Sequence, residues 1–159
     1  MPGKPTAYPL AAVFCYVLLG LVPQSSLATA GETFTLVEHG TRSDGSRAFD
    51  IVDFDPKGPS PGDMETLNKE LYDKDNIKLL GHMNGWCVRT VPYEVWECIF
   101  TVILADGQMA LQGPFYDKTS DSVFTVTGGT GKYVNTRGEM KSVERGDASL
   151  DYDDIFTLQ

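Results

Sequence analysis

The chain has 159 residues, the length of one domain, and 42% of them are hydrophobic. Its 22 acidic and 13 basic residues give a formal net charge of −9, which argues against the basic surface that nucleic acids and anionic lipids require. Charged residues make up 22% of the chain and aromatic residues 11%, a composition of folded rather than disordered chains. Because only 3 Cys and 2 His are present, we expect no zinc site, no other metal and no cofactor.

The first thirty residues have the features of a secretory signal peptide. An unbroken apolar run covers Leu10–Val22, which is shorter than the roughly twenty residues that a membrane span needs. The segment Ala28–Ala30 then supplies a small-x-small cleavage pattern. We therefore predict a signal peptide at 1–30 and a secreted domain at 31–159, with no membrane contact after cleavage; the alternative is a short membrane anchor.

The remaining chain has the pattern of short strands separated by turns. Pro56–Asp63 is a loop by composition, and Met64–Tyr72 is the best helix candidate. The spacing of the strands is typical of an all-β sandwich or barrel. We expect strands near 33–38, 47–54, 78–90, 95–105, 108–115, 122–127, 133–142 and 152–158.

Two hairpins are predicted in the middle of the chain. Asp106-Gly107 has the composition of a two-residue type I′ turn, which pairs Leu104 with Met109. A second hairpin, centred on Pro92-Tyr93, places Cys87 directly opposite Cys98. The separation of an opposed pair suits a disulfide, and a secreted protein meets oxidising conditions. We predict a Cys87–Cys98 disulfide; the alternative is a free Cys87 thiol in a pocket.

Because side chains alternate along a strand, these hairpins present two different faces. The apolar face must line a core or a cavity, and the other, with Ile99 and Ile103, is either a subunit interface or a face covered by loops. The apolar face contains Cys87, Trp96, Cys98, Phe100, Val102, Leu104, Met109 and Leu111.

The chain resembles the superfamily of allene oxide cyclases and dirigent proteins over most of residues 31–159. The resemblance implies an all-β fold, an eight-stranded antiparallel barrel with an apolar cavity, usually assembled as a homotrimer. The glycine-rich stretch within it is read as a tight strand–strand turn and not as a phosphate loop. The stretches that carry the resemblance are Asn68–Asp73, Gly85–Val88, Leu111–Phe115, Phe124–Tyr133, Arg137-Gly138 and Ile155–Leu158.

The resemblance implies one of two activities. In allene oxide cyclases a cavity cysteine, matched here by Cys87, accompanies an acidic residue and an asparagine on the first strand. Those two positions hold Thr35 and Val37 here, unless a shift brings Glu38 into the cavity. The secretory signal and the glycine-rich stretch instead resemble dirigent proteins, which orient reactive molecules so that coupling is stereoselective.

Three polar residues are candidates for catalysis. Arg137 is a candidate cavity cation or a rim ion pair, and Tyr133 a hydrogen-bond donor or a barrel-closing aromatic. Asp154 is either a buried acid with a raised pKa or a solvent-facing carboxylate. Asn84 is expected either to orient a ligand oxygen or to cap a turn. The predicted substrate-binding residues are Asn84, Cys87, Trp96, Phe100, Val102, Met109 and Leu111.

The sequence thus predicts a secreted dirigent-like barrel that binds a reactive hydrophobic small molecule and steers its coupling or cyclisation. One alternative is an allene oxide cyclase-type isomerase acting on an unstable fatty-acid epoxide. A second is a lipocalin-like carrier that only binds an apolar ligand.

Overall fold

A computed structural model describes residue 3 and residues 31–117, 121–146 and 150–159. The predicted signal peptide lies outside the described residues, apart from Gly3. The described part is all-β, and none of it forms a helix long and apolar enough to cross a membrane. Its strands are β1 (Thr33–Glu38), β2 (Phe49–Val52), β3 (Met64–Tyr72), β4 (Leu79–Val91), β5 (Val95–Leu104), β6 (Gly107–Tyr116), β7 (Ser122–Gly131), β8 (Gly138–Glu144) and β9 (Tyr152–Leu158).

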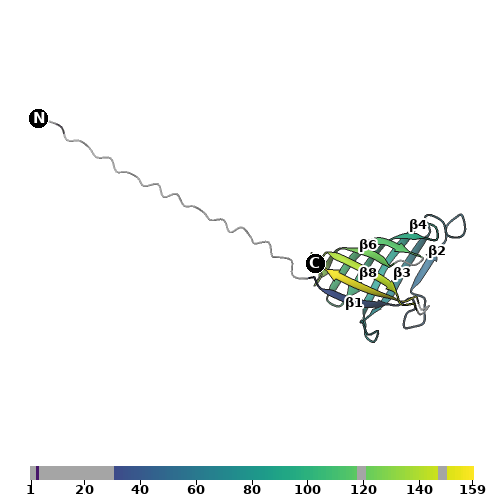
Figure 1. The fold of residues 1–159 in the computed structure, drawn as a ribbon, viewed down its shortest axis with the longest axis horizontal. Coiled ribbons are helices and arrows are strands. Elements are labelled where there is room, and N and C mark those ends of the chain that lie inside the picture. Colours follow the sequence, from purple (N-terminus) through teal and green to yellow (C-terminus); the bar gives the residue numbers. More distant parts are fainter. Residues whose placement is uncertain (1–2, 4–30, 118–120, 147–149) are drawn as a thin grey trace.

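The strands form one antiparallel sheet that closes into an eight-stranded barrel (Figure 1). Its order is β1-β9-β8-β7-β6-β5-β4-β3-β2, and an additional pairing of β1 with β3 closes the barrel. This closing seam is short, since only Val37↔Tyr72 and Glu38↔Leu71 are paired across it. Strand β2 stays outside the closed barrel, where it pairs with β3 at the end opposite the C-terminus (Figure 1).

Of the two hairpin predictions, one register is confirmed and the other is displaced by two residues. The register Cys87↔Cys98 is confirmed, and the two cysteines form a disulfide with a Cα–Cα distance of 4.0 Å. The turn between β5 and β6 is displaced, because Leu104 pairs with Gly107 rather than Met109. A shift of two residues preserves the faces, since side chains alternate with period two. The predicted apolar face is therefore the inner one, and all of its members are buried except Leu104, which is partly buried.

Two other expectations about the elements are wrong. Met64–Tyr72 is strand β3, not a helix, because pairing with β2 and β4 on both edges outweighs the helix propensity of its Glu, Leu and Lys residues. The glycine-rich segment continues strand β7 as far as Gly131, and the turn follows it. There Tyr133 N–H donates to Thr130 O and Asn135 has a φ of 63°, so the next strand begins at Gly138 instead of near 133.

The interior of the barrel is tightly packed at its middle. The inner side chains of the central strand positions are fully buried, and the Phe34 and Phe156 rings stack with centroids 4.8 Å apart. Gly85 lies under Phe100, and a Cβ at this position would be 2.6 Å from the Phe100 ring and 2.3 Å from Ile99 O. The packed middle therefore divides the barrel into two separate ends. It is formed by Val102, Met109, Leu111, Val126 and Phe156.

The disulfide is expected to contribute to stability, because it closes a short loop in the unfolded chain. Replacing both cysteines, as C87A/C98A, should lower the free energy of unfolding by about 2–3 kcal/mol. Urea denaturation of the two proteins with and without a reductant measures this. Reductant should destabilise the wild-type protein and leave C87A/C98A unchanged; an equal response of both would contradict the expectation.

Candidate functional site

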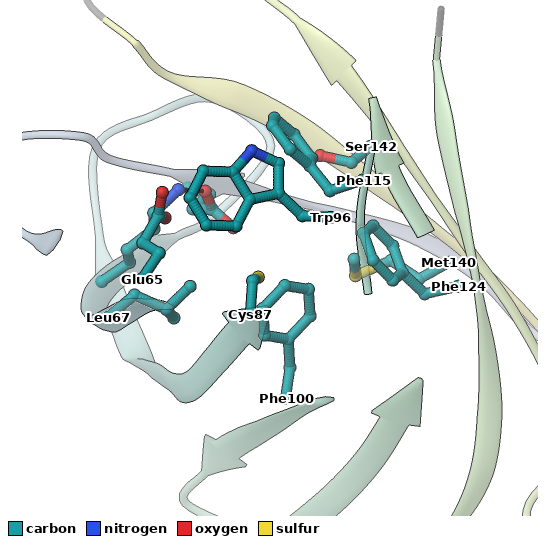
Figure 2. Close-up of a pocket in the computed structure, with 11 residues that line it drawn as sticks. Glu65, Leu67, Cys87, Trp96, Phe100, Phe115, Phe124, Met140 and Ser142 are labelled. Carbon is teal, nitrogen blue, oxygen red and sulfur yellow. Dashed lines mark hydrogen bonds and ion pairs between the residues drawn. The ribbon is translucent and has the colours of Figure 1, made fainter. Parts of the chain in front are cut away.

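One end of the barrel interior contains a small cavity with charged groups in its wall (Figure 2). We call it the inner cavity; its volume is about 30 Å³, room for about two water molecules. Most of its wall is apolar, as expected, but four polar side chains also face it. It is lined by Glu38, Glu65, Leu67, Lys69, Cys87, Trp96, Phe100, Phe115, Phe124, Met140 and Ser142.

The inner cavity opens toward a larger space at the same end, which we call the vestibule. Its volume is about 310 Å³, and four of its residues also line the inner cavity: Glu65, Lys69, Trp96 and Phe115. The vestibule combines four aromatic rings with three cationic side chains. Its lining consists of Arg47, Phe49, Ile51, Glu65, Lys69, Arg89, Trp96, Phe115, Asp117, Leu150 and Tyr152.

The aromatic wall of the vestibule is held in place by polar contacts. The Trp96 indole N–H donates to Asp117 at 2.8 Å, and Arg89 donates to the other oxygen of the same carboxylate at 2.8 Å. The Arg89 guanidinium also lies 3.8 Å from the centre of the Trp96 ring. Across the space, the Phe115 and Tyr152 rings meet edge to face with centroids 5.9 Å apart. The rings therefore have fixed positions before any ligand arrives.

A buried ion pair lies at the base of the inner cavity. Lys69 on β3 donates to the Glu38 carboxylate on β1, and both side chains are nearly inaccessible to solvent. Desolvation lowers the pKa of the Lys69 ammonium, but attraction by Glu38, Glu65 and Asp154 outweighs it, so the pKa is raised overall. Lys69 thus stays protonated and stabilises negative charge next to the cavity.

Asp154 lies behind this pair. It is completely buried on β9, and neither carboxylate oxygen has a hydrogen-bond partner of normal geometry among the described residues. Burial, followed by repulsion from Glu38, raises the pKa of Asp154 well above its usual value; the nearby Ser142 hydroxyl and Lys69 only partly oppose this. The burial and raised pKa that the sequence suggested are therefore present. Asp154 does not line the inner cavity, however, although its neighbours Glu38 and Ser142 do.

The structure separates the other two catalytic candidates from this end of the barrel. The Arg137 side chain is exposed and donates to Thr136 O, so it is not a cavity cation. Tyr133 is buried but lines a different space, of about 330 Å³, at the opposite end. The packed middle of the barrel separates that space from the inner cavity.

The predicted substrate-binding residues also divide into groups. Cys87, Trp96 and Phe100 line the inner cavity as expected. Val102, Met109 and Leu111 are interior but belong to the packed middle. Asn84 is on the outer face, where its side chain accepts a 2.7 Å hydrogen bond from Asn68. Its position contradicts a ligand-orienting role, because Cys87 points inward and a residue three positions earlier must point outward.

Sequence reasoning missed Glu65, Lys69 and Ser142, and left Glu38 undecided. On β1 the cavity faces Glu38, while Thr35 and Val37 are not among its lining residues. Read as a strand, Met64–Tyr72 places Glu65, Leu67 and Lys69 on one face by simple alternation. Within the described residues, no group of three or more His, Cys, Asp or Glu side chains is arranged to hold a metal ion.

Comparison with known proteins identifies the fold. No family model and no curated protein matches the chain. Among solved structures, a pyocyanin demethylase is 25% identical with a TM-score of 0.67, and the match covers 80% of this chain and 100% of that one. A pterocarpan synthase dirigent protein (15% identity, 80% and 92% coverage) has a TM-score of 0.62. An exo-specific intermolecular Diels-Alderase (14% identity, 82% and 98% coverage) has a TM-score of 0.60.

These neighbours share one architecture with this chain. The chain has the same barrel fold as these dirigent proteins and this Diels-Alderase, as its sequence suggested.

The raised pKa of Asp154 predicts how stability depends on pH. Because the pKa is higher in the folded state than in the unfolded state, the protonated group favours folding below the ordinary Asp pKa, and this contribution is lost as pH rises through the folded-state pKa. The isosteric variant D154N stays neutral. Its free energy of unfolding should therefore increase relative to wild type as pH rises above about 4, by about 1.4 kcal/mol per unit of pKa difference.

Urea denaturation between pH 4 and pH 8 measures this difference. D50N, which removes an exposed carboxylate on β2, serves as the control. A difference between D154N and wild type that does not change with pH would contradict a buried, neutral Asp154.

Proposed function

We propose that this barrel binds an aromatic small molecule in the vestibule and controls its coupling or cyclisation at the entrance to the inner cavity. The observation that carries the proposal is a ring-lined space of about 310 Å³ that leads to a buried Lys69–Glu38 pair. Fixed rings restrict the orientation of a planar ligand, and the buried ammonium stabilises negative charge that develops on it.

The neighbouring structures support this proposal through what their names state. They include a pyocyanin demethylase, pterocarpan synthase dirigent proteins and enzymes of [4 + 2] cycloaddition. Each name refers to chemistry on a small organic molecule. The inner cavity, with about 30 Å³, is too small for the acyl chain of a fatty-acid epoxide or for a carrier's enclosed ligand. Neither alternative is therefore supported by the inner cavity.

The vestibule proposal predicts that blocking this space abolishes product control. Ile51 lines the vestibule and is 45% exposed, so I51W adds bulk there without removing a core side chain. Its neighbour Val52 points to the other side of β2, and V52W is the matched control. With coniferyl alcohol and a one-electron oxidant, wild type and V52W should give an enantiomeric excess of the coupled product, and I51W at least a tenfold smaller excess.

Chiral chromatography of the products measures the excess. A racemic product with wild-type protein at saturating concentration would overturn the proposal for this class of substrate. Equal excess with I51W and V52W would place the controlling site elsewhere in the barrel.

We further propose that the protein acts outside the cell as a homotrimer. The Cys87–Cys98 disulfide is compatible with secretion. On the outer face, Trp86 on β4 pairs with Ile99 on β5, and they are 41% and 40% exposed. Such an apolar pair suits burial against a second barrel.

If the trimer forms through this outer face, a negative charge introduced there should disrupt it. W86E should convert the trimer to a monomer in light scattering coupled to size-exclusion chromatography. V123E, which places the same charge at an exposed apolar position on β7, should leave the mass unchanged. A monomeric wild-type protein at micromolar concentration would contradict the proposal.

A further inference from the structure

Glu65 occupies the boundary between the two spaces of the site. It lines both the inner cavity, where Figure 2 labels it, and the vestibule, as do Lys69, Trp96 and Phe115. Its position follows from strand β3, whose inward residues are Glu65, Leu67 and Lys69. A ligand in the vestibule that reaches toward the inner cavity therefore passes the Glu65 carboxylate.

The Glu65 carboxylate differs from the other carboxylates of the site. Glu38 is paired with Lys69, and Asp117 accepts from Arg89 and Trp96. Within the described residues, the carboxylate of Glu65 makes no hydrogen bond and no ion pair within 4.0 Å. Burial raises the pKa of Glu65, and attraction by Lys69 only partly opposes this.

A purely apolar ligand is unsuited to such a group. It would displace water from Glu65 and leave a carboxylate without a hydrogen-bond donor, which is unfavourable. A ring that carries an O–H or N–H would instead supply the missing donor. The nearby cations Lys69 and Arg47 also line the vestibule, and the Arg47 guanidinium lies 4.0 Å from the centre of the Phe49 ring.

We propose that the vestibule takes planar aromatic compounds with an acidic O–H or N–H, and that Glu65 is the catalytic residue that accepts this proton. The inference rests on the proposed function, since it assigns a substrate class and a base to the same site. The proton moves from the ligand oxygen or nitrogen to a Glu65 carboxylate oxygen. The electron pair of the broken bond stays on the ligand, whose new negative charge faces Lys69 and Arg47. No electron is exchanged, and Glu65 returns the proton to solvent through the vestibule.

Two probes that differ in a single donor test this inference by equilibrium dialysis. 2-Naphthol has an O–H, and 2-methoxynaphthalene has the same ring system without one. We expect wild-type protein to bind 2-naphthol about tenfold more tightly, the preference typical of a hydrogen bond to a charged acceptor. In E65Q the preference should fall below about threefold, because 2-naphthol loses the charged acceptor and 2-methoxynaphthalene no longer leaves a carboxylate without a donor. The matched variant D50N should behave as wild type.

The pH dependence supplies a second readout that a merely structural role would not change. The preference for 2-naphthol should decrease as pH is lowered from 7.5 to 4, because protonated Glu65 is a weaker acceptor, and E65Q should show no such decrease. Within the described residues, the charged and titratable groups around Glu65 are Glu38, Arg47, Lys69, Arg89, Asp117 and Tyr152.

The two proposals fail in distinguishable ways. If wild type and E65Q show the same preference, Glu65 is not the acceptor, although binding of both probes would still support the vestibule as a ring-binding site. If neither probe binds to wild-type protein at its solubility limit, the proposed function itself is overturned. Binding of 2-methoxynaphthalene to E65Q at least as tight as to the wild-type protein shows that the variant is folded.

Discussion

The ion pair between Lys69 and Glu38 connects the architecture of this barrel to its chemistry. The sheet closes through only two residue pairs between β1 and β3, and Glu38 belongs to one of them. On β3, Lys69 lies two residues before Leu71, the residue that pairs with Glu38, and its side chain reaches Glu38 across the same seam. The contact that joins the two edges of the sheet is therefore also the charged base of the inner cavity.

Closing a barrel with a buried ion pair carries a large desolvation penalty. Removing two charges from water costs several kcal/mol, and well-packed apolar residues often stabilise a protein as much or more. The seam could be closed by such residues, as the packed middle of the same barrel demonstrates. The charge retained at this end acts on its neighbours instead: Glu38 raises the pKa of Lys69, and it adds to burial, the larger cause, in raising the pKa of Asp154.

Much of the fold, and less of the site, follows from sequence alone. The turn centred on Pro92-Tyr93 predicted the register of the β4–β5 hairpin, and alternation then predicted its inner face, because a period of two is a strong local constraint. The same alternation was obscured on β3, where the inward positions Glu65 and Lys69 are charged and resemble the surface of a helix. Their burial becomes understandable only when β1 brings Glu38 next to Lys69, a contact between distant segments. Prediction from local sequence pattern was therefore wrong on β3, the strand that lines the site. Such failures are expected at functional sites.

The division of the interior has a further consequence for how such a site works. Because the middle of the barrel is packed, the space at this end is separate from the space at the other end. Arg89 and Asp117 fix the wall of the vestibule by holding Trp96, so little ordering remains to be done when a ring binds. The vestibule stays open, whereas the charges beneath it are shielded from solvent. In the proposed function, a ring held at this boundary has one edge next to Glu65 and the buried Lys69–Glu38 pair and the other edge near water. The fixed wall then sets the orientation of the ring, and orientation decides where the next bond forms.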